Sequence, residues 1–94
     1  MNNDASQARL YVVYLGGDLV PGRMGEDHEV VVVAAADAAA ARGKAKARWR
    51  GAGRAHVDAL QHIERVDGYD VVLQPGAPGD VITTDATYEP ADPN

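Results

Sequence analysis

The sequence predicts a small α+β domain in which one helix packs on one face of a mostly antiparallel sheet of four strands. One segment, residues 37–50, is helical in character, and four segments rich in β-branched and aromatic residues surround it in the order ββαββ. A fifth strand at residues 81–84 is left open. Connections of hairpin length dominate, which favours antiparallel pairing.

The first two predicted strands are apolar on both of their faces. Residues 10–15, LYVVYL, end at Gly16-Gly17, and residues 28–35, HEVVVVAA, form the second segment. Between them lies a turn-rich loop that contains Pro21-Gly22. Strands that are apolar on both sides are normally central in a sheet and covered on both faces.

The predicted helix begins at Asp37, whose carboxylate can accept hydrogen bonds from the free N–H groups of the first turn. A run of alanines follows, and alanine is the best helix former. Spacings of three and four place one set of residues on a single face: Ala38, Ala41, Ala45 and Trp49. Gly43 interrupts this helix, and a close approach to a strand would explain it.

Residues 56–66 fit either a helix or a strand. We favour a strand, because Asp67-Gly68 is a strong hairpin signal and the apolar segment 69–73 follows it. We therefore expect a frayed, disordered N-terminus at residues 1–9, one domain at 10–84 and an acidic, proline-containing tail at 85–94.

Composition narrows the range of function classes. The 94 residues include 9 basic and 14 acidic side chains, for a net charge of −5, and no cysteine. The polar N-terminus and the lack of a long apolar run predict a cytoplasmic protein that does not bind membranes. Six of the nine basic residues lie within 42–54, so a local anion site is conceivable, but the overall charge argues against general nucleic-acid binding.

One helix can cover only one face of the predicted sheet. The second face then needs another cover, and a second copy of the chain in a homodimer is the simplest one. Two alternatives remain: residues 75–94 fold back over that face, or the face assignment is different.

The three histidines give the chain its only candidate chemistry. His56 and Asp58 are two residues apart and share a strand face, and His28 on a neighbouring strand could join them as metal ligands or as an acid–base site. His62 would reach that face only if no bulge intervenes. A polar sheet edge with a structural His–Asp hydrogen bond explains the same pattern, and we weight it above a metal site.

Other motifs are weaker. The glycine-rich loop lacks the nucleotide-binding spacing and leads into a strand, so it predicts turns; a small-molecule pocket lined by Tyr14 and Tyr69 remains conceivable. No nucleophile motif is present, no cofactor is expected, and the sequence decides neither for nor against enzyme activity.

Several segments recur in an order that resembles the bacterial family called domain of unknown function 1543, over roughly residues 10–74. They are LYVVYLGG, PG, DHEVVVV, the helix end at Trp49, HVD and VDGYDVVL. The resemblance implies a small bacterial domain, found singly or as a tandem pair, and no known activity. The leading expectation is therefore a non-enzymatic self-association module, and the alternative is a metal-binding or acid–base domain that uses His28, His56 and Asp58.

Overall fold

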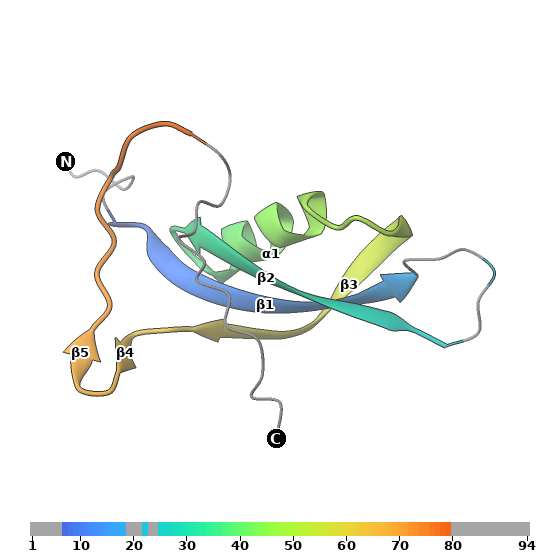
Figure 1. The fold of residues 1–94 in the computed structure, drawn as a ribbon, viewed down its shortest axis with the longest axis horizontal. Helices are drawn as coiled ribbons and strands as arrows, with labels where there is room; N and C mark the ends of the chain where they lie inside the picture. Colours follow the sequence, from blue (N-terminus) through green and yellow to red (C-terminus); the bar gives the residue numbers. More distant parts are fainter. Residues whose placement is uncertain (1–6, 19–21, 23–24, 80–94) are drawn as a thin grey trace, which may run out of the picture.

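The computed structural model describes residues 7–18, 22 and 25–79 of the chain. Strands β1 (Arg9–Asp18), β2 (Asp27–Ala35) and β3 (Ala52–His62) form an antiparallel sheet in the order β2-β1-β3. Helix α1 (Ala38–Ala47) lies along one face of this sheet (Figure 1). The α+β class and the antiparallel pairing are therefore confirmed, and residues 56–62 are strand rather than helix.

Strand β1 is central, and both of its neighbours run antiparallel to it. Strands β2 and β3 consequently run parallel to each other, and α1 connects them across one face. This crossover brings the beginning of β2, the beginning of β3 and the end of β1 to the same end of the sheet (Figure 1). The candidate site lies at that end.

The prediction of a four-stranded sheet is wrong. Beyond β3, the short strands β4 (Arg65–Val66) and β5 (Tyr69–Asp70) pair only with each other and form a separate hairpin. The hairpin turn is as predicted, since Asp67 and Gly68 both have positive φ, at 52° and 84°. Each arm holds only two residues, too few to extend alongside β3. The predicted strand at 81–84, the tail at 85–94 and residues 1–6 lie outside the described residues.

The helix packs through the residues that the sequence predicts. The Asp37 carboxylate caps it by accepting a hydrogen bond from the Ala40 N–H at 2.8 Å. Ala41 and Ala45 are fully buried against the sheet, and Trp49, just past the helix end, packs on the same core. Gly43, by contrast, faces open space rather than a strand, so the predicted close approach is wrong.

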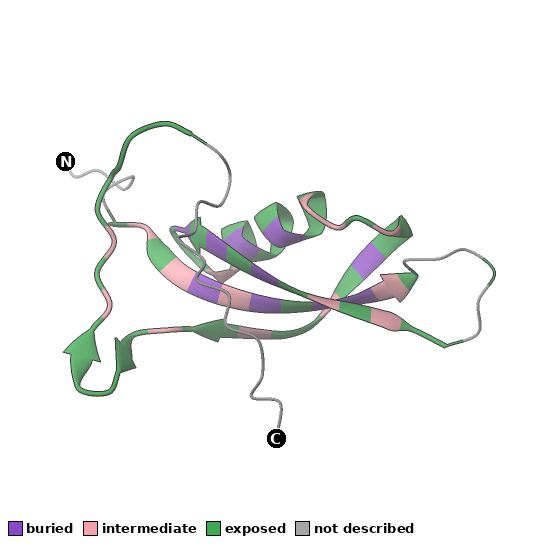
Figure 2. Ribbon diagram, in the orientation of Figure 1, coloured by how far each residue is buried: buried purple, intermediate pink, exposed green. Residues whose placement is uncertain are grey.

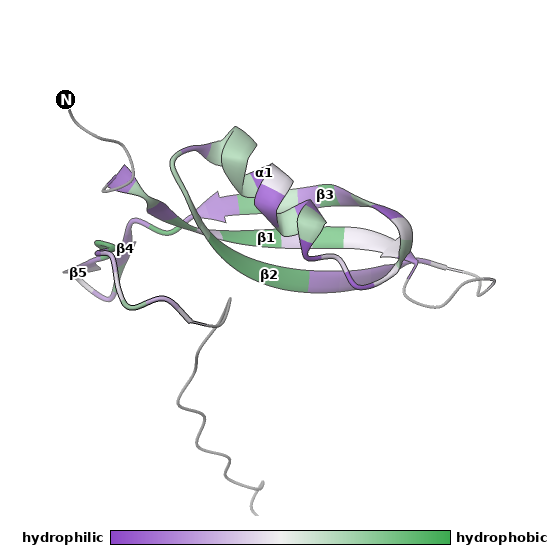
Figure 3. Cartoon of the chain, turned by 90° about the horizontal axis from the view of Figure 1, so that it is seen from above, coloured by the Kyte–Doolittle hydropathy of each residue, from purple (hydrophilic) through white to green (hydrophobic). Residues whose placement is uncertain are grey.

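The core lies between α1 and the sheet, and exposure alternates along the strands (Figure 2). Strands β1 and β2, both with hydrophobic stretches, run side by side under the helix (Figure 3). The strand residues of this core are Tyr11, Val13, Leu15, Val31, Val33, Ala35 and Ala55. The alternate residues of the same strands point to the opposite face. Within the described ranges, no helix or strand covers that opposite face, which we name the open face.

Candidate functional site

Four polar side chains gather at one end of the open face, and we name them the carboxylate–imidazole cluster: Glu26, His28, His56 and Asp58. The strand register explains the gathering. Gly16, near the end of β1, is the partner of His28 on β2 and also of His56 on β3. The two imidazoles therefore flank the same glycine from opposite sides. The strand of His28 is not the direct neighbour of the strand of His56, because β1 lies between them.

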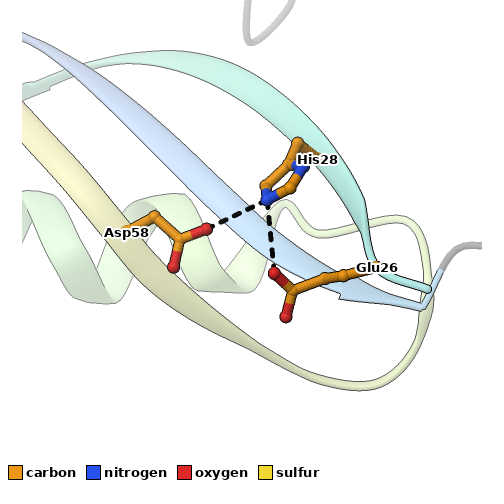
Figure 4. Close-up of side chains that lie close together, drawn as sticks. All are labelled: Glu26, His28 and Asp58. Carbon is orange, nitrogen blue, oxygen red and sulfur yellow. Dashed lines mark ion pairs between the residues drawn. The ribbon is translucent and has the colours of Figure 1, made fainter.

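Each carboxylate of the cluster contacts both imidazoles. His28 Nε2 lies 3.2 Å from Glu26 Oε1 and 3.2 Å from Asp58 Oδ2 (Figure 4). His56 Nε2 lies 3.0 Å from Glu26 Oε2 and 3.0 Å from Asp58 Oδ1. The two oxygens of each carboxylate are thus divided between the two histidines.

A β-bulge lies at Asp58. Tyr14 pairs with Ala59, whereas the next residue, Leu15, pairs with Val57, so Asp58 is an extra residue on β3. The bulge also reverses the alternation beyond it. His62 consequently lies on the helix side, where its ring centroid is 5.3 Å from that of Tyr11, and it does not join the cluster.

The backbone at Gly16 leaves the room that the cluster occupies. A Cβ atom at this buried position would lie 2.6 Å from Asp58 Oδ2, 2.8 Å from His56 Nε2 and 3.0 Å from Glu26 Oε1. Real Cβ atoms essentially never come closer than 3.0 Å to another atom, so a Cβ at residue 16 would require the ends of the Asp58 and His56 side chains to shift.

Of the two tyrosines predicted to line a pocket, only Tyr14 lies at the site. Its ring stacks on that of His28, with centroids 4.8 Å apart and planes 4° from parallel. Tyr69 is 78% exposed on the β4–β5 hairpin, beyond the opposite end of the sheet (Figure 1). The structure therefore does not bring Tyr69 to the cluster.

Sequence reasoning missed Glu26, because it falls within the segment predicted to be a loop. Its signal was the spacing Glu26-x-His28, which matches His56-x-Asp58 on the other flanking strand. Two residues separated by one position share a face when the strand geometry continues to both.

The family model for Domain of Unknown Function (DUF1543) matches residues 23–73, which is more than half of the chain. The chain belongs to this family. The matched segment contains all four residues of the cluster, whereas β1, with Gly16, precedes it. No curated protein and no solved structure matches the chain.

The basic helix of this DUF1543 domain is largely engaged with β2. Lys44 Nζ donates to the Ala34 carbonyl oxygen at 2.6 Å, and Arg48 Nη1 donates to that of Val32 at 2.7 Å. Arg50 pairs with Glu29 at 2.5 Å, just beyond the helix. These cations cover the outer edge of β2, which would otherwise expose unpaired carbonyl groups.

In the described part of the chain, no helix has the length and apolar character needed to cross a membrane.

Proposed function

We propose that this DUF1543 domain is a non-enzymatic self-association module, a cytoplasmic homodimer that buries the open face against the open face of a second copy. The observation that carries the proposal is the exposure of large apolar side chains there. Val30 is 61% exposed, Val32 is 40% exposed and Tyr14 is 39% exposed. Covering a valine fully is worth about 1.5–3 kcal/mol, so the face provides a strong driving force for association.

The distribution of charge leaves the middle of the open face suitable for contact with a second copy. The middle of the open face carries only uncharged side chains: Leu10, Val12, Tyr14, Val30, Val32, Ala34, Ala59 and Gln61. Two copies of a chain with a net charge of −5 repel each other over most of their surfaces. This uncharged middle can meet its own symmetry mate without placing like charges opposite each other.

The edge of β2 is a poor alternative route to association. Strand addition at an edge needs free backbone groups. Lys44 and Arg48 already occupy the carbonyl oxygens of Ala34 and Val32 on that strand. Face-to-face packing therefore has fewer existing interactions to displace than pairing along this edge.

The test is the mass in solution of the full chain and of two matched variants. Val30→Asp places a charge on the open face, whereas Val66→Asp places the same charge on the β4–β5 hairpin, where Val66 is 49% exposed. We expect the wild-type chain and Val66→Asp to have about twice the 9.9 kDa monomer mass by analytical ultracentrifugation, and Val30→Asp to be monomeric. A wild-type monomer at high micromolar concentration would refute the proposal, as would equal dissociation of both variants.

A second candidate function uses the carboxylate–imidazole cluster as a metal-binding or acid–base site. The convergence of two imidazoles and two carboxylates on one end of the open face favours it. Its acid–base form requires a substrate whose chemistry the cluster alone does not specify. Its metal-binding form makes a sharper prediction, because the donor atoms define the ligand.

A further inference from the structure

We propose that Glu26, His28 and Asp58 bind one divalent transition-metal ion of the zinc type, and that His56 positions the two carboxylates for it. One donor atom from each of the three ligands lies within 4.8 Å of the other two. The inference concerns the second candidate function and does not depend on self-association.

Two of the three distances between donor atoms are close to those of a tetrahedral site, and the third, between Glu26 and Asp58, is within 4.8 Å. Ligand atoms at 2.0–2.2 Å from a tetrahedral ion lie about 3.3–3.6 Å from one another. His28 Nε2 is 3.2 Å from the nearest oxygen of Glu26 and 3.2 Å from that of Asp58 (Figure 4). An outward movement of His28 Nε2 by a few tenths of an ångström would bring both of these distances into that range. Three protein ligands would leave the fourth position for water or another ligand.

The donor types select the class of ion. Imidazole nitrogen suits zinc, copper, iron and nickel, whereas magnesium and calcium prefer sites made of oxygen. The chain has no cysteine, so thiolate ligation is excluded. A site with one nitrogen and two carboxylate oxygens should thus bind Zn²⁺ in preference to Mg²⁺.

The contacts of the two histidines distinguish the oxygens of each carboxylate. The inner oxygen lies next to His28, and the outer oxygen lies next to His56. His56 contacts Glu26 Oε2 and Asp58 Oδ1, both at 3.0 Å. The other oxygen of each group, Oε1 or Oδ2, is the one that lies next to His28. An outer-shell partner close to the other oxygen helps to fix the orientation of a ligating carboxylate, and such partners typically affect metal affinity 10–100-fold. His56 therefore acts through the ligands as a positioning residue.

Gly16 gives the cluster its observed arrangement room. Its φ is not among the positive values of the described glycines, so another residue could adopt this backbone conformation. A Cβ here would lie within 3.0 Å of Glu26, His56 and Asp58, and these side chains would have to shift to accommodate it. The stacking of Tyr14 on His28 adds a second constraint, since it holds the imidazole ring in one plane.

Isothermal titration calorimetry of the full chain with ZnCl₂ tests the proposal, with MgCl₂ as the control cation. We expect one Zn²⁺ per chain and no measurable Mg²⁺ binding. His28→Gln and Asp58→Asn should each weaken Zn²⁺ binding by more than about tenfold. The matched control is His62→Gln, which removes the same kind of side chain from the other face and should leave the affinity unchanged.

Two further variants separate a metal site from a purely structural hydrogen-bond network. His56→Leu should weaken Zn²⁺ binding about 10–100-fold, and His56→Gln, which retains an N–H donor, should recover part of that loss. Gly16→Ala should also weaken Zn²⁺ binding, because its methyl group displaces the carboxylates, and thermal melts in EDTA establish whether each variant is folded. If Gly16→Ala does not fold, Asp58→Asn still decides the question, because Asp58 is partly exposed.

The proposal is overturned if the wild-type chain does not bind Zn²⁺. It is also overturned if Asp58→Asn or His28→Gln binds Zn²⁺ as tightly as the wild type. The mass measurement in EDTA keeps the two proposals separate. A chain that is dimeric in EDTA and does not bind Zn²⁺ would overturn the metal site and leave self-association standing.

Discussion

The two faces of the central sheet are built from the same strands and the same residue types, yet they have opposite environments. In the run Val30–Val33, Val31 and Val33 are 7% and 2% exposed under the helix, whereas Val30 and Val32 are 61% and 40% exposed on the open face. The difference comes from the alternation of side chains along a strand and from the single helix that connects β2 to β3. Apolar character in a strand thus shows which residues can be buried, and the position of the covering element decides which of them are.

The largest effect on stability should come from a cavity at the centre of the sheet face that α1 packs on, which we name the covered face. Leu15 is fully buried between the sheet and α1, and Leu15→Ala removes its side-chain volume from a core that contains few large residues. We expect a loss of about 2–5 kcal/mol in the free energy of unfolding, measured by urea denaturation. A loss below about 1 kcal/mol, the size typical of a surface substitution, would mean that the covered face is not the main core.

A matched pair on β2 compares the two faces directly. Val33→Ala should cost about 2 kcal/mol, because Val33 is 2% exposed, and this cost should not vary with protein concentration. Val30→Ala on the open face should cost less than about 1 kcal/mol in the monomer. If the open face is a dimer interface, the cost of Val30→Ala grows with protein concentration, since association stabilises the folded state by mass action. Thermal melts over a hundredfold range of concentration measure both behaviours.

Local sequence signals predicted the helix, the face through which it packs and the hairpin turn. Asp37 predicted the beginning of the helix, its alanine spacing predicted the side that packs, and Asp67-Gly68 predicted the hairpin turn. Each of these features depends on residues within a few positions of one another. The separation of the β4–β5 hairpin from the sheet was not predictable in this way, because it depends on where β3 stops pairing with β1.

The carboxylate–imidazole cluster was predictable only in part, for the same reason. The spacing of His56 and Asp58 and the order of the strands predicted that His28 would lie nearby. Glu26 was missed because it lies at the end of a loop. The bulge at Asp58, which excludes His62, is a property of the pairing between β1 and β3 and has no clear signal in β3 alone.

The smallest expected effect tests which side of the helix touches the sheet. Gly43 lies on the side away from the sheet, and a Cβ atom there would meet nothing within 4 Å. Gly43→Ala should therefore stabilise the fold by up to about 1 kcal/mol, because alanine loses less backbone entropy than glycine in a helix. Urea denaturation of this variant beside the wild type measures the gain. If the helix instead packed closely enough for Gly43 to approach a strand, as the sequence alone predicted, the added methyl group would clash and the substitution would be destabilising. A rise in stability would thus confirm that Ala41 and Ala45, rather than Gly43, form the contact between α1 and the covered face.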